Sequence, residues 1–157
     1  MRARSVVHAS FTITRSWKAA PSRVFDAFAD QDAKRKWFGR APGGEIQEEI
    51  FDFREGGREV LAGRHANGMV TRFDCLYRDI VAPEAGAAGR IVYSYVMHLD
   101  GAKISVSHAC IELRPEDAGT RFVLTEYGDY LDGYDDAGNR EHGTNALMDR
   151  LGAFVED

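Results

Sequence analysis

The chain begins with a stretch in which apolar and polar residues alternate. Between residues 6 and 17, Val7, Ala9, Phe11 and Ile13 share one parity, and most of the residues between them are polar. Successive side chains of a strand point to opposite faces of a sheet. The stretch therefore predicts a strand with one buried face.

Two short helices are predicted directly after this strand. Pro21 suits the first turn of a helix, and Val24 and Phe28 follow at helical spacing, which predicts a helix over 21–29. A second helix is expected over 31–38, where it ends in an aromatic pair.

From residue 45 to about residue 131 the alternating pattern returns repeatedly. The predicted strands span 45–54, 58–66, 69–82, 90–99, 103–114 and 120–130. The links between them are short, and Asn67-Gly68 is a typical hairpin turn. Parallel strands need long crossovers, so these strands are expected to be antiparallel.

The apolar phase slips within the segment 103–114. Ile104, Val106 and Cys110 share one parity, whereas Ile111 and Leu113 share the other. A β-bulge would account for the change, and bulges also bend sheets.

The C-terminal segment 139–156 predicts a long helix with Asn139 as its N-cap. Its apolar residues recur at helical spacing and form a wide stripe that should face a core. They are Leu147, Met148, Leu151, Phe154 and Val155.

The order of elements predicts an α+β fold. A curved antiparallel sheet of six to seven strands should wrap around the long C-terminal helix, with two short helices after the first strand. One helix covers the middle of such a sheet better than its edges, which predicts an internal cavity. With 157 residues the chain is expected to be one domain, residues 1–157.

Composition narrows the classes of partner. The formal charge of -5 and the pI of about 5.5 argue against binding to nucleic acid or to an anionic membrane. The N-terminus lacks a signal-peptide pattern and no segment could span a bilayer, so a cytoplasmic location is expected. Cys75 and Cys110 are interpreted as buried free thiols.

Several runs of residues together resemble a known family. They are APSRVFDAF at 20–28, KWF at 36–38, DFREGG at 52–57, RIVY at 90–93, GTRFVLTE at 119–126 and the closing helix. The chain is similar to the START-like, or SRPBCC, superfamily. Within it, the nearest group is named after the activator of the heat-shock-protein ATPase. The resemblance implies the helix-grip fold and a hydrophobic cavity, and it leaves the function open because relatives bind, catalyse or assist chaperones.

Glu126 is the most prominent candidate for chemistry. Phe122 and Leu124 share its parity, so its carboxyl should point into the core, as a structural group or as a pocket acid. His108 shares parity with Ile104 and Val106 and is also expected to point inward. If the two side chains meet, they would be the best acid–base pair in the chain. His98 is expected to face away from Tyr93, Tyr95 and Met97.

The other candidate ligand-contacting residues are aromatic, aliphatic or sulfur-containing. They are Trp37, Phe38, Phe73, Cys75, Tyr93, Tyr95, Met97, Phe122, Leu124, Leu147 and Leu151. Core packing is the alternative explanation for each of them. The sequence contains no motif for a metal, a nucleotide or a flavin, so no cofactor is expected.

Three functions remain open at this stage. The first is binding of a small, largely apolar ligand without chemistry. The second is a cyclase, dehydratase or hydrolase that uses Glu126 with His108 or a tyrosine. The third is a chaperone-assisting role in protein interaction. Pairing of edge strands in a homodimer is neither favoured nor excluded.

Overall fold

The computed structural model describes residues 2–39 and 42–157 of the chain. Seven antiparallel strands form a sheet in the order β1-β7-β6-β5-β4-β3-β2. Their bounds are Val6–Trp17, Glu45–Phe51, Arg58–Arg64, Val70–Val81, Gly89–Leu99, Ala102–Glu116 and Gly119–Leu131 for β1 to β7. Every pairing apart from β1 with β7 joins strands that are neighbours in the sequence, as the short predicted links require.

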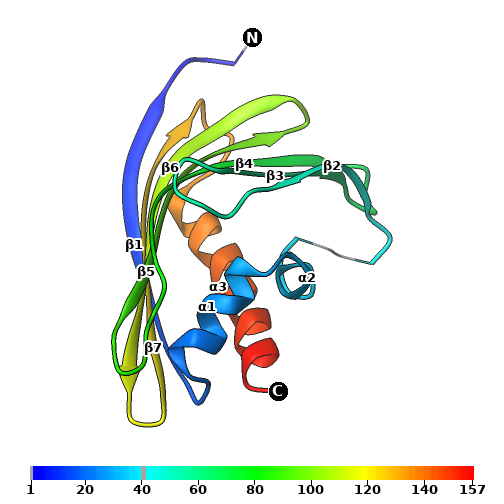
Figure 1. Ribbon diagram of the computed structural model, residues 1–157. Helices are drawn as coiled ribbons and strands as arrows, with labels where there is room; N and C mark the ends of the chain where they lie inside the picture. The colour runs from blue at the N-terminus through cyan, green and yellow to red at the C-terminus, as the bar shows by residue number, and fades with distance from the viewer. Residues whose placement is uncertain (1, 40–41) are drawn as a thin grey trace.

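The sheet curves strongly, and the helices lie on its concave side (Figure 1). They are α1 (Pro21–Ala29), α2 (Gln31–Lys34) and α3 (Ala137–Val155). The predicted helix-grip arrangement, an α+β fold with a bent antiparallel sheet around a C-terminal helix, is confirmed. The predicted Asn67-Gly68 turn is confirmed as well, with Gly68 at a φ of 88° that favours glycine.

Two helix boundaries differ from the prediction. The second helix ends at Lys34 rather than at residue 38, and Trp37 follows in a turn that lets its indole N–H donate to the carbonyl oxygen of Ala27 at 2.9 Å. Asn139 is not the N-cap of α3. Asp136 is, and its side chain accepts from the backbone N–H of Asn139 at 2.8 Å.

A bulge in β6 explains the phase slip, but it lies nearer the start of the strand than the sequence suggested. Met97 pairs with Ser105 and His98 pairs with Lys103, so Ile104 is the extra residue. From Ser105 onward the odd-numbered residues of β6 face the concave side. Because one inserted residue reverses every later side chain, the predicted orientation of His108 is wrong.

The apolar stripe of α3 packs at one end of the molecule, against α1 and the ends of β1 and β7. Trp17 and Phe122 lie in contact there, with ring centroids 4.9 Å apart. Gly152 allows this packing, because a Cβ on it would lie 2.7 Å from the indole nitrogen of Trp17. Toward its N-terminus the helix diverges from this core, and the space beside it is the pocket described below.

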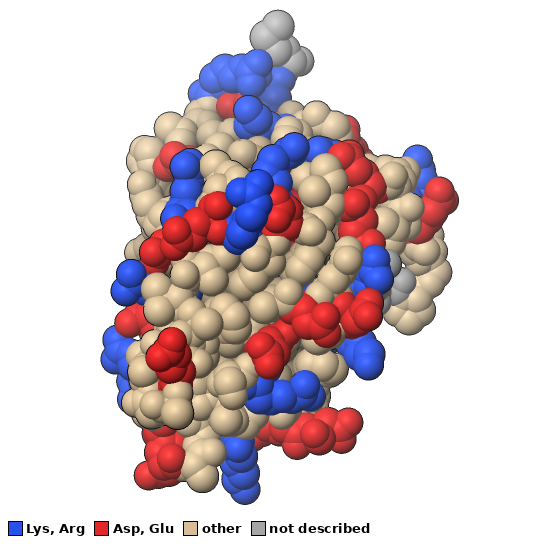
Figure 2. All heavy atoms as spheres, viewed as in Figure 1, with Lys and Arg blue, Asp and Glu red and all other residues tan. Residues whose placement is uncertain are grey.

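Charged side chains of both signs are intermixed on the face shown in Figure 2. Ion pairs between strands include Arg72 of β4 with Glu48 of β2 at 2.6 Å. Within residues 2–39 and 42–157, no helix has the length and apolar character that a membrane span needs.

Candidate functional site

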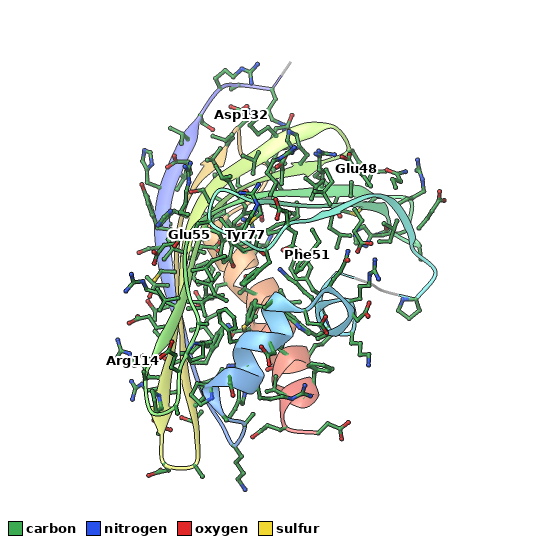
Figure 3. All side chains as sticks on the ribbon, in the orientation of Figure 1. Glu48, Phe51, Glu55, Tyr77, Arg114 and Asp132 are labelled. Carbon is green, nitrogen blue, oxygen red and sulfur yellow. The ribbon has the colours of Figure 1, made fainter. Side chains whose placement is uncertain are left out.

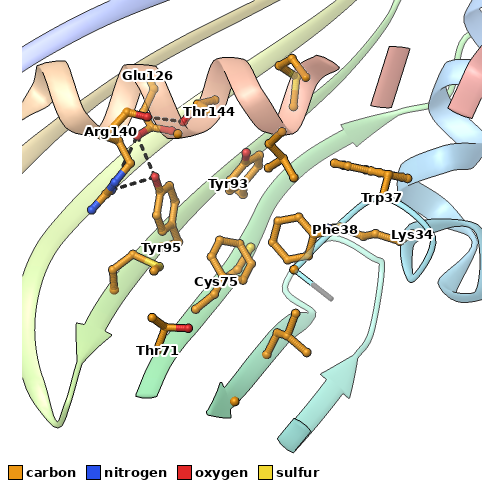
Figure 4. A pocket seen from close by; sticks show the side chains of 18 of the residues that line it. Lys34, Trp37, Phe38, Thr71, Cys75, Tyr93, Tyr95, Glu126, Arg140 and Thr144 are labelled. Carbon is orange, nitrogen blue, oxygen red and sulfur yellow. Dashed lines mark hydrogen bonds and ion pairs between the residues drawn. The ribbon is translucent and has the colours of Figure 1, made fainter. Parts of the chain in front are cut away.

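A pocket of about 420 Å³ lies on the concave face, between the sheet, α2 and the N-terminal half of α3. Strands β2 to β7 all contribute residues to its sheet side. Its opposite wall comes from α3, through residues such as Arg140, Gly143, Thr144 and Leu147. Figure 4 shows the pocket from close by.

Glu126 of β7 lies in the pocket wall and is 2% exposed. Its Oε2 accepts a hydrogen bond from the Tyr95 hydroxyl at 2.7 Å, and an Arg140 nitrogen lies 3.9 Å from the same oxygen. Burial raises the pKa of the Glu126 carboxyl above its ordinary range, while the Tyr95 bond and the Arg140 charge act in the opposite direction. A carboxyl of this kind holds its proton to higher pH than an exposed one.

Arg140 of α3 is held by several oxygens at once, and its side chain is 11% exposed. It donates to the Tyr95 hydroxyl at 3.0 Å, to Ser105 Oγ at 2.7 Å and to Asp135 Oδ2 at 3.2 Å. The bulge in β6 is what turns Ser105 toward the helix. This is a typical effect of a bulge beside a functional region, where it re-aims a side chain.

A second buried polar cluster lies at α2 and joins Lys34, Glu59 of β3 and Tyr77 of β4. Lys34 Nζ lies 2.6 Å from Glu59 Oε1, and the Tyr77 hydroxyl donates a short hydrogen bond to the same oxygen. The Lys34 amine also lies 4.6 Å from the ring centre of Phe38. Figure 3 shows Tyr77 within the fold. We name this group the Glu59 triad, and we name Glu126, Tyr95 and Arg140 the Glu126 triad.

Tyr93 lies between the two triads on the floor of the pocket. Its ring centroid is 6.1 Å from that of Tyr77 and 6.0 Å from that of Tyr95. Cys75 lies on the neighbouring strand, where burial raises the pKa of its thiol to about 12. At neutral pH this thiol is protonated and behaves as a small apolar group.

Ten of the residues proposed from the sequence line this pocket. They are Trp37, Phe38, Phe73, Cys75, Tyr93, Tyr95, Met97, Leu124, Glu126 and Leu147. For the residues on β4, β5 and β7 this position follows from strand alternation, which the sequence pattern predicted correctly. Trp37 and Phe38 come from the segment after α2, and Leu147 comes from α3. Their role in binding stays a prediction.

Three proposed residues lie elsewhere. His108 is exposed on the convex face, where it is paired in register with Tyr127 and lies 3.4 Å from Ser94 Oγ. It cannot meet Glu126, because the two side chains are on opposite faces of the sheet. Phe122 and Leu151 are fully buried in the packed core and not in the pocket wall, because α3 and the sheet approach each other closely there.

Two further predictions concern His98 and the two cysteines. His98 points away from Met97, as predicted, and is half-buried. Cys75 is buried as expected, but Cys110 is half-buried on the face opposite Cys75, again because of the bulge. Both thiols are free.

Four residues of the two triads were not predicted from the sequence, namely Lys34, Glu59, Tyr77 and Arg140. A signal for Arg140 was present, because it lies on the same helical face as Thr144, Leu147 and Leu151 at spacings of three to four residues. No comparable signal marked Glu59, since β3 is apolar at both parities.

The fold and pocket define a helix-grip protein of the START-like superfamily. Residues 18–156 match the family described as Activator of Hsp90 ATPase homolog 1-like protein, and the chain belongs to that family. No curated protein matches the sequence.

Solved structures agree with this assignment. A Rhizobium loti protein is 40% identical, with a TM-score of 0.85 over 96% of this chain and 99% of its own. An uncharacterised protein from Rhizobium leguminosarum is 37% identical, with a TM-score of 0.88 over 98% of each chain. An AHSA1-like protein from Aeromonas hydrophila is 19% identical, with a TM-score of 0.68 over 94% of this chain and 92% of its own, and supports the fold alone.

Proposed function

We propose that this protein binds a small, largely apolar molecule in the pocket between its sheet and α3. The observation that carries the proposal is a pocket of about 420 Å³ with many aromatic and aliphatic side chains in its wall. Ligand sites are typically 300–1,000 Å³, mostly apolar, and contain a few polar groups that orient the ligand. The pocket-lining members of the two triads would be those polar groups: Glu126, Tyr95, Arg140, Lys34 and Tyr77.

Gly143 offers a way to close the pocket without disturbing the backbone. It lies in the pocket wall, and a Cβ added to it would meet nothing within 4 Å. Gly143→Leu should therefore place a side chain in the space that a ligand would use. Gly143→Ala is the matched control, because it makes the same backbone change and leaves most of the space.

The test uses N-phenyl-1-naphthylamine, an uncharged dye that becomes fluorescent in apolar sites. The wild-type protein and Gly143→Ala should bind the dye and be stabilised by it in thermal unfolding, by about 2.7 kcal/mol at a hundredfold excess over Kd. Gly143→Leu should bind it at least tenfold more weakly. Equal binding by wild type and Gly143→Leu, or no binding to wild type, contradicts the proposal.

A second candidate is an enzyme of the cyclase, dehydratase or hydrolase type in which Glu126 transfers the proton. It is favoured by a pocket-lining carboxyl of raised pKa that accepts a hydrogen bond from Tyr95. Pocket ligands would be incubated with the protein and followed by chromatography for conversion. Glu126→Gln should abolish the conversion and leave dye binding intact, and unchanged conversion excludes this candidate. A chaperone-assisting role stays an untested expectation.

A further inference from the structure

The two triads have the same chemical plan. In each triad, a glutamate carboxyl oxygen on one strand accepts a hydrogen bond from a tyrosine hydroxyl on another strand. A cationic side chain from a helix lies beside the same oxygen. Glu126 Oε2 accepts a hydrogen bond from the Tyr95 hydroxyl and lies near the Arg140 guanidinium. Glu59 Oε1 accepts hydrogen bonds from the Tyr77 hydroxyl and from Lys34 Nζ.

The triads reach one pocket at different ends, the first through Glu126, Tyr95 and Arg140 and the second through Lys34 and Tyr77. Glu59 is buried and is not part of the pocket lining. Figure 4 shows Lys34 far from Glu126 and Arg140, with Tyr93 and Phe38 between them. The ring centroid of Tyr93 lies 6.1 Å from that of Tyr77 and 6.0 Å from that of Tyr95. The Tyr77 and Tyr95 ring centroids are therefore at most about 12 Å apart. One small molecule can span that distance.

The charges within each triad indicate which chemical group of a ligand would bind there. A carboxylate and a cation are already paired in each triad, so an ionised ligand group would meet a like charge at either end. Asp135, which also pairs with Arg140, adds a further negative charge at the Glu126 end. At the Glu126 end a neutral hydroxyl can donate to the carboxylate and accept from Arg140. At the other end it can accept from Lys34 and exchange a hydrogen bond with the Tyr77 hydroxyl, which are the members of the Glu59 triad that line the pocket.

We propose that the pocket selects a ligand with an apolar body and a neutral hydroxyl-type group at each end, one for the Glu126 triad and one for the Glu59 triad. This inference rests on the proposed ligand-binding function. It adds a second polar anchor at Lys34 and Tyr77, both of which Glu59 holds in place. It also predicts that two well-separated polar groups bind better than two adjacent ones.

Hydroxylated biphenyls test the inference, measured by calorimetry and by displacement of N-phenyl-1-naphthylamine. The series is 4-hydroxybiphenyl, 4,4′-dihydroxybiphenyl and 3,4-dihydroxybiphenyl, in which the last has both hydroxyls at one end. We expect the 4,4′ compound to bind about fivefold more tightly than either of the others, the equivalent of one net hydrogen bond. 4′-Hydroxybiphenyl-4-carboxylate should bind more weakly than the 4,4′ compound.

Equal affinities within the series, or tighter binding of the 3,4 compound or the carboxylate, overturn the inference. If the dye binds and the 4,4′ compound has no advantage, only the inference fails. If neither the dye nor any biphenyl binds, the proposed function fails with it.

Tyrosine variants locate the second anchor. Tyr77→Phe removes the hydroxyl of the Glu59 triad and should abolish the advantage of the 4,4′ compound over 4-hydroxybiphenyl. Tyr127→Phe, the same change at an exposed tyrosine on the convex face, should preserve it, because Tyr127 does not line the pocket. Retention of the advantage in Tyr77→Phe, or its loss in Tyr127→Phe, overturns the assignment. Dye binding by each variant reports that its pocket is intact.

Discussion

Tyr95 of β5 reaches Glu126 of β7 across the strand that separates them, with 2.7 Å between the hydroxyl and Oε2. The intervening strand presents Ser107 and Ala109 on this face, and both are buried. Small side chains there leave room for the two longer ones to meet. The pairing therefore depends on three strands at once, and it brings a carboxyl and a phenol together in the pocket wall.

The first prediction concerns pH. The pKa of Glu126 is raised in the folded protein, so the folded state binds more protons than the unfolded state in the window from the ordinary pKa of 4.5 up to the folded value. The free energy of unfolding should fall through that window as pH rises, by up to about 1.4 kcal/mol per pH unit. Glu126→Gln should remove this slope, as measured by urea unfolding across pH. Identical slopes for both proteins would refute the assignment.

The second prediction concerns Arg140, whose charge opposes the rise in the pKa of Glu126. Arg140→Met should move the decline in stability to higher pH. It should also destabilise the protein by about 1–3 kcal/mol, since the buried Ser105 hydroxyl loses its partner. Arg114→Met is the control, because Arg114 lies on an exposed part of the sheet and pairs with Glu112. No difference between the two variants in the pH profile would count against this account.

The third prediction concerns the buried ion pair of Lys34 and Glu59, whose side chains are 9% and 6% exposed. Lys34→Met should cost about 3–5 kcal/mol, because it leaves a buried carboxylate without its cation. The double variant Lys34→Met with Glu59→Leu should recover most of that loss. Lys36→Met, at an exposed lysine two residues away, should change stability by less than about 0.5 kcal/mol. Chemical denaturation of the wild type, Lys34→Met, Glu59→Leu and the double variant measures the coupling, and additive effects would contradict it.

The fourth prediction compares two glycines of α3. Gly152→Ala should destabilise the protein by about 1–3 kcal/mol, because its Cβ would lie 2.7 Å from Trp17 Nε1 in a closely packed core. Gly143→Ala meets open space and should stabilise the helix by up to about 1 kcal/mol. Thermal unfolding gives both values. A similar shift for both variants would mean that the close packing of Trp17 on Gly152 is not what the structure indicates.

Local pattern was sufficient for most of the fold. Strand alternation oriented Glu126, Tyr93 and Tyr95 correctly, because each strand keeps its period of two over the relevant residues. The prediction for His108 was wrong because β6 does not keep this period throughout. The bulge at Ile104 adds one residue, and its position depends on the register with β5 rather than on the composition of β6.

What the sequence alone determined is the order of the elements, the antiparallel sheet around the last helix, and the inward direction of the Glu126 carboxyl. These depend on periodicity and on short links, which are properties of neighbouring residues. Only the tertiary structure decided that Arg140 reaches Glu126, that Lys34 pairs with Glu59, and that members of both clusters line one pocket. Those contacts join residues far apart in the chain, and their geometry depends on how strongly the sheet bends around α3.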